Sequence, residues 1–118
     1  MRLLPLLFVS LSVFVSLSAV VSSTANAADT EKGRAAFVRH GCFQCHGFMG
    51  QGGSAGKTLA PNPLPFETFS VFVRNTSGAM PPFQKAILSD EDLADIYAYL
   101  RAIPRPPDYK TIPLLGGD

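Results

Sequence analysis

The chain has few of the residues that build metal and reactive sites, and it has no excess of either charge. Its 118 residues hold two cysteines and two histidines, and ten Lys and Arg face nine Asp and Glu. A structural zinc site normally takes four ligands in two separated pairs, whereas all four candidates here fall within residues 40–46. No basic stripe is present that would attract nucleic acid. The composition therefore argues against a zinc domain and excludes a nucleic-acid-binding protein.

Internal repeats and convincing strand pairs are also missing. A Cys-x-x-Cys pair serves thiol–disulfide exchange in some exported proteins, but usually on a βαβ-type scaffold, which this chain lacks. A bare disulfide between Cys42 and Cys45 would close a loop too small to remove much entropy from the unfolded chain. The purpose of the cysteine pair is therefore the main question that the sequence poses.

The N-terminus has the pattern of an export signal. Arg2 precedes a mainly apolar stretch at residues 3–21, and Ala25-Asn26-Ala27 forms a small-x-small cleavage pattern. We expect residues 1–27 to be a secretory signal peptide, with an uncleaved membrane anchor as the alternative. Cleavage would remove only Arg2 among the charged residues and leave a formally neutral chain of about 91 residues, enough for one small domain.

Helical patterns mark both ends of the expected domain, residues 28–103. Near the start, Thr30 is a candidate N-cap for a helix that ends by Gly41, with Gly33, Ala36 and Phe37 on its buried side. The last helix is the clearest. Ser89 is its expected N-cap, Pro104 stops it, and an apolar stripe recurs at i, i+3, i+4 and i+7: Leu93, Ile96, Tyr97 and Leu100.

The middle of the domain is rich in loop-forming residues. Glycines make residues 47–56 a loop, and three prolines make residues 61–65 extended. Residues 66–73 fit a short helix, with a strand as the alternative. The Pro- and Gly-rich tail, residues 104–118, is expected to run extended over the surface. The chain therefore predicts a small all-α domain with three to four short helices and long loops.

Covalent haem accounts for each residue of the Cys42-Phe43-Gln44-Cys45-His46 pattern. Two thiols separated by two residues match the two vinyl groups on one edge of the porphyrin, and the adjacent histidine is placed to bind the iron. Seven phenylalanines outside the expected signal peptide supply apolar surface for a large apolar group. We therefore expect one covalent haem c, held by Cys42 and Cys45, with His46 as the proximal iron ligand.

These residues, the later "SGAMPPF" (residues 77–83) and the amphipathic last helix resemble the class I cytochromes c. The resemblance covers residues 30–103 and implies the small class I cytochrome c fold wrapped around one haem. It also implies that Gly33 and Phe37 lie where the first helix crosses the last, around Ile96, Tyr97 and Leu100. The carbonyl of Pro61 is expected, on the same ground, to accept the proton on Nδ1 of the proximal imidazole.

Two methionines outside the expected signal are candidates for the distal iron ligand. Met49 lies three residues after His46, and that length of chain reaches at most about 10 Å, too short to pass around the haem edge. Met80 has ample chain, and Pro81 and Pro82 stiffen the backbone beside it. We therefore expect Met80 to be the distal ligand and Met49 to pack within its loop.

Two polar residues before Met80 keep open roles. Arg74 and Asn75 are expected either to contact the haem propionates or the Met80 region, or to form a solvated helix end.

His/Met ligation leaves no open iron position for a substrate, so the sequence indicates an electron carrier and not an enzyme. The expected function is periplasmic one-electron transfer to and from redox proteins: a dehydrogenase, an oxidase or another cytochrome. Stable membrane insertion is not expected if the signal is cleaved. The alternatives are a haem c subunit of a periplasmic dehydrogenase complex, a zinc or thiol protein, and a haem sensor or peroxidase with an open iron.

Overall fold

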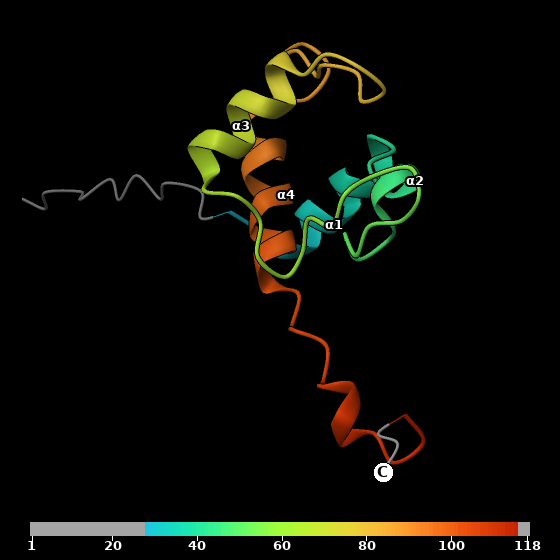
Figure 1. Cartoon of the computed structure of the whole chain (residues 1–118). Helices are drawn as coiled ribbons and strands as arrows, with labels where there is room; N and C mark the ends of the chain where they lie inside the picture. Colours follow the sequence, from blue (N-terminus) through green and yellow to red (C-terminus); the bar gives the residue numbers. More distant parts are fainter. Residues whose placement is uncertain (1–27, 116–118) are drawn as a thin grey trace, which may run out of the picture.

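A computed structural model describes residues 28–115, and the expected signal peptide lies outside these residues. The described part contains four α-helices, one 3₁₀ turn and no strand, as Figure 1 shows. The elements are α1 (Thr30–Arg39), α2 (Phe43–His46), α3 (Phe66–Asn75), α4 (Asp90–Ala102) and η1 (Tyr109–Thr111). The all-α prediction is confirmed, and residues 66–73 belong to a helix.

The two long terminal helices are capped by acidic and hydroxyl side chains. Ser89 accepts a hydrogen bond from the backbone N–H of Asp92, so it is the N-cap of α4 as expected. The N-cap of α1 is Asp29, whose carboxylate accepts from the N–H groups of Glu31 and Lys32. The expected cap, Thr30, is instead the first residue of the helix. Asp is at least as good an N-cap as Thr, because its carboxylate also faces the positive end of the helix.

Helices α1 and α4 cross in direct backbone contact, which Gly33 permits (Figure 1). A Cβ atom at Gly33 would overlap the backbone carbonyl of Asp95 and lie 2.9 Å from the Cβ of Tyr99. Phe37 lies one turn further along α1 and packs its ring against that of Tyr99, with centroids 5.8 Å apart. The expected crossing is confirmed, but its contacts are with Asp95 and Tyr99.

The core lies between these two helices and α3. The expected stripe of α4 is buried at Leu93, Ile96 and Leu100, while Tyr97 is only half-buried. The ring of Tyr97 packs instead on two phenylalanines of α3, Phe66 and Phe69, at centroid distances of 5.1 and 5.5 Å. This aromatic contact joins α3 to the outer side of the α1–α4 pair.

Beyond Ile103 the tail runs away from the domain and does not lie over its surface (Figure 1). Its described hydrogen bonds are all local, and they form the turn that begins at the cap Asp108. The expectation that the tail covers the domain is therefore wrong for residues 104–115. Of the helices in residues 28–115, none is both long and apolar enough to cross a membrane.

Candidate functional site

The cysteine pair lies at the short helix α2, close to the end of α1: Cys42 is its N-cap, in helical conformation, and Cys45 lies within it. Cys42 and Cys45 are one helical turn apart, so their side chains project from the same face of the helix. The two cysteines form no disulfide; Cys42 is half-buried and Cys45 is exposed. Burial raises the pKa of the Cys42 thiol to about 11. Reactive redox cysteines need the opposite shift, toward the thiolate, so this environment does not favour thiol–disulfide exchange.

His46 is held by the loop that follows it. Its Nδ1 lies 2.7 Å from the carbonyl oxygen of Lys57. A carbonyl can only accept, so Nδ1 carries the proton and Nε2 keeps a lone pair for a metal. The expected partner, Pro61, does not fill this role. The loop reaches His46 earlier because it passes close to α2: a Cβ at Gly56 would lie 2.8 Å from the carbonyl oxygen of Cys45 and 2.9 Å from Nδ1 of His46.

The segment that carries Met80 is closed at its base. The N–H of Phe83 donates to the carbonyl of Val73 in the last turn of α3 at 2.9 Å, so this bond closes the loop of residues 76–82. Met80 is half-buried and packs against the apolar core. Met49 is 52% exposed, so the expectation that it packs within its loop is wrong. Of the two methionines, Met80 is the one whose place the fold restricts.

Arg74 fastens this loop from the side of α3. Its guanidinium donates to the carbonyls of Phe83 and Leu88, at 2.8 and 2.6 Å, and its side chain is only 12% exposed. A further bond of 2.8 Å reaches the carboxylate of Asp90 at the start of α4. Of the roles that the sequence left open for Arg74, contact with the Met80 region is the one observed. Asn75 donates to the carbonyl of Val71 within α3.

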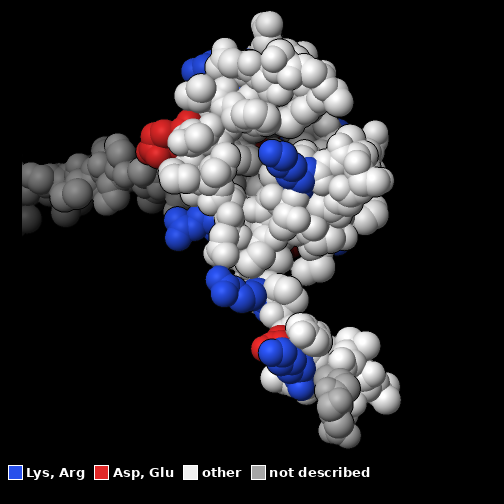
Figure 2. All heavy atoms as spheres, in the orientation of Figure 1, with Lys and Arg blue, Asp and Glu red and all other residues white. Residues whose placement is uncertain are grey.

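The described ion pairs gather at two carboxylates in the first turn of α4, Asp90 and Asp92. The hydrogen bond from Lys85, and with it the bond from Arg74, holds the pKa of Asp90 below its ordinary value. Burial opposes ionisation of Asp92, but the hydrogen bond and charge of Arg39, together with hydrogen bonds from Ser89 and His40, outweigh it and lower the pKa of that carboxyl. The face shown in Figure 2 carries isolated charged groups on a largely uncharged surface.

The domain exposes large apolar side chains that suit a bulky apolar group. Phe72 and Val71 on α3 are 55% and 63% exposed, and Phe48 after α2 is 61% exposed. The ring of Phe48 stacks on that of Phe43, between the two cysteines in sequence, with centroids 4.6 Å apart. These side chains lie on two separate segments, and each offers apolar surface that a bulky group would cover. Together with two free thiols and an imidazole nitrogen, these residues fit a haem.

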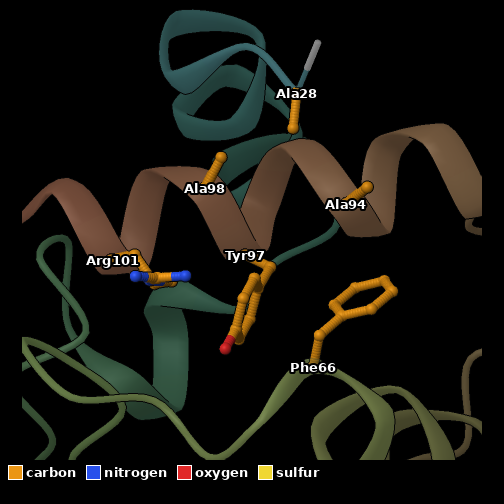
Figure 3. Close-up of a pocket in the computed structure, with 6 residues that line it drawn as sticks. All are labelled: Ala28, Phe66, Ala94, Tyr97, Ala98 and Arg101. Atoms are coloured by element: carbon orange, nitrogen blue, oxygen red, sulfur yellow. The ribbon is translucent and has the colours of Figure 1, made fainter. Parts of the chain in front are cut away.

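A separate hollow of about 360 Å³ lies elsewhere, between α3 and α4 (Figure 3). Its lining consists of Ala28, Phe66, Ala94, Tyr97, Ala98 and Arg101. It contains neither cysteine, nor His46, nor Met80. Residues 28–115 also hold no group of three or more Cys, His, Asp and Glu side chains placed to share a metal ion.

The fold and the Cys-x-x-Cys-His helix define a small cytochrome c domain, which transfers electrons and is not an enzyme. A comparison with protein-family models supports this at the level of sequence. The family described as cytochrome c oxidase, cbb3-type, subunit III matches residues 28–100, and the chain belongs to this family. Cys42 and Cys45 accordingly carry one covalent haem c. Searches of curated proteins and of solved structures found no match.

Two contacts of the site have no signature in the sequence. The carbonyl of Lys57 is a backbone group, and any residue at that position would supply it. The bonds of Arg74 to Phe83 and Leu88 depend on how the loop folds back. The only available signal was that an arginine at the end of a helix precedes the Met80 segment by six residues.

Proposed function

We propose that this protein is a periplasmic one-electron carrier whose haem iron is bound by His46 and Met80. Haem c supplies an iron that alternates between the ferrous and ferric states, and a thioether ligand favours the ferrous state. The observation that carries the proposal is the bond of 2.7 Å between Nδ1 of His46 and the carbonyl of Lys57. It fixes the tautomer in which Nε2 is the metal ligand, as is usual for metal-binding histidines.

The place of Met80 supports it as the second ligand. The loop that holds it is tied to α3 through Val73 and Arg74, and the methionine side chain is half-buried against the core. Such a loop restricts the positions that the sulfur can reach. Both proposed ligands are therefore positioned by backbone carbonyls and a buried guanidinium, and little reorganisation is needed when the iron changes charge.

Export to the periplasm is part of the proposal. Its support is the signal-like sequence of residues 1–27, and the cytochrome c family is typically periplasmic. Cleavage after Ala27 would leave a chain that begins at Ala28, one residue before the N-cap of α1.

A second candidate function is that of a haem c subunit in an electron-transfer complex. The observation that favours it is the family's own description, which names a subunit of a cbb3-type oxidase. A periplasmic dehydrogenase complex is the other setting for such a subunit. Purification of the native protein under mild conditions separates the two functions: a carrier elutes alone, whereas a subunit elutes with a catalytic partner.

The ligand assignment is tested by replacing each methionine in the haem-loaded protein. Met80→Ala should remove the weak charge-transfer band that methionine gives to ferric haem at the red end of the visible spectrum. It should also lower the reduction potential and let carbon monoxide bind the ferrous iron. The matched control, Met49→Ala, removes an equal side chain that is 52% exposed, and it should leave band and potential nearly unchanged.

The reverse result would assign the distal position to Met49. If neither variant altered the band, the distal ligand would not be a methionine. Carbon monoxide binding by the unmodified protein would favour the haem sensor or peroxidase over the carrier.

A further inference from the structure

Asp95 is a buried carboxyl group that the electron-transfer site does not use. It is 4% exposed and faces α1 at the crossing of the two terminal helices. Within residues 28–115, no Lys, Arg or His nitrogen lies within 4.0 Å of its carboxylate. Its described hydrogen bond comes from the backbone N–H of Asp29, at 2.6 Å. A buried carboxylate with no counter-charge is costly, so its surroundings call for a cation.

The neighbouring backbone nitrogen belongs to Ala28. Consecutive backbone nitrogens are at most about 3.7 Å apart, so the nitrogen of Ala28 lies within about 6.3 Å of the Asp95 carboxylate oxygen. Ala28 lies over α4 beside Ala94 and Ala98, which are one residue before and three residues after Asp95 (Figure 3).

We propose that the Ala27–Ala28 bond is a processing site whose cleavage supplies the counter-charge of Asp95. Hydrolysis by a signal peptidase adds one water molecule. It leaves a carboxylate on Ala27 and an amine on Ala28, which takes a proton at neutral pH. The new ammonium pairs with Asp95 and ties the start of α1 to α4. The precursor has a neutral amide at this position and lacks the pair. This inference rests on the export step of the proposed function.

Other charges near the new terminus act in both directions. The positive end of α1 repels an ammonium, by an amount comparable to a surface ion pair. The carboxylate of Asp29 attracts it, but this group is exposed and already accepts from two backbone N–H groups. Arg101, the cation that lines the hollow in Figure 3, forms no described ion pair with Asp95. The buried carboxylate is therefore the strongest attraction on the ammonium.

The test is a cycle of two changes on the haem-loaded mature protein. The first is Asp95→Asn, which keeps an oxygen for the N–H of Asp29 and removes the charge. The second is acetylation of the α-amine at mildly acidic pH, where lysine side chains stay protonated. Mass spectrometry verifies that the chain begins at Ala28 and carries one acetyl group. Denaturant titration then gives the unfolding equilibrium constant of all four forms.

Acetylation should raise the unfolding constant of the unmodified protein about tenfold, which corresponds to about 1.4 kcal/mol, and that of Asp95→Asn less than twofold. If Asp95→Asn does not fold, one glycine inserted before Ala28 in the native sequence replaces it. That insertion moves the ammonium by up to about 3.8 Å and should cause about the same loss as acetylation.

Equal effects of acetylation in both backgrounds would overturn the proposal, as would an inserted glycine without effect. A mature chain that begins elsewhere would overturn it too. The haem spectrum and reduction potential of the same samples report separately on electron transfer. A failure of the ion pair is thus distinguishable from a failure of the proposed function.

Discussion

Replacing Gly33 by alanine tests the helix crossing on which the fold depends. The added Cβ would overlap the backbone carbonyl of Asp95, and a backbone group cannot rotate away. Overpacking typically lowers the free energy of unfolding by 1–3 kcal/mol, and because the clash is with backbone we expect about 3 kcal/mol at this site. Alanine recovers about 1 kcal/mol of helix propensity over glycine. The expected net loss is therefore about 2 kcal/mol, or a fall of roughly 8–16 °C in Tm for a domain of this size.

Thermal unfolding of the haem-loaded protein, followed by far-UV circular dichroism, measures this loss. Gly53→Ala is the matched control, because the nearest atom to its added Cβ is the carbonyl oxygen of Cys45 at an ordinary 3.9 Å. The control should melt within about 3 °C of the native protein, as surface substitutions usually do. A Gly33→Ala protein that melts with the control would refute the close crossing of α1 and α4.

Two further predictions concern charged side chains. Arg74→Gln should loosen the Met80 loop, weaken the methionine charge-transfer band and speed carbon monoxide binding. Lys85→Gln is the control and should change none of these, since its ammonium reaches only an exposed carboxylate. Equal spectra for both variants would argue against a role of the Arg74 hydrogen bonds in holding the loop. Asp92 has a lowered folded pKa, so its contribution is present above pH 3.8 and is lost as the pH falls through the folded pKa. Arg39→Gln should therefore reduce the drop in the urea midpoint of unfolding that occurs below about pH 4, and it should cost less than about 1 kcal/mol of stability at pH 7. An unchanged drop below about pH 4 would contradict this prediction.

The parts of the fold that sequence predicts are those set by local pattern. The stripe of α4 begins four residues after a side-chain cap, and this combination places Ser89, Leu93 and Leu100 where the structure has them. Gly33 was predictable only through the family resemblance, because a glycine in a first helical turn is also simply tolerated. The helix α2 was not predicted, since four residues are too few to show a period.

The errors arise where a contact depends on the path of a loop. The family resemblance made Pro61 the expected partner of His46, but the glycine-rich loop returns earlier and presents Lys57. The tail was expected to run extended over the domain surface because it is rich in proline and glycine. Its described bonds instead close a local turn after Asp108, and local turns of this kind compete with docking.

The two proposed ligands illustrate how this small domain compensates for its long loops. His46 ends α2 and Met80 lies within the loop after α3, and each adjoining loop is fixed by a carbonyl that accepts a side-chain hydrogen bond. Lys57 supplies one carbonyl and Phe83 the other, and the buried guanidinium of Arg74 joins the second loop to both α3 and α4. Because hydrogen bonds to charged groups are the stronger kind, the Met80 loop is held by charge and the His46 loop by close glycine packing. Salt screens only the bond of Arg74 to the exposed carboxylate of Asp90, so high ionic strength should weaken the hold on Met80 slightly and leave the His46 loop unaffected.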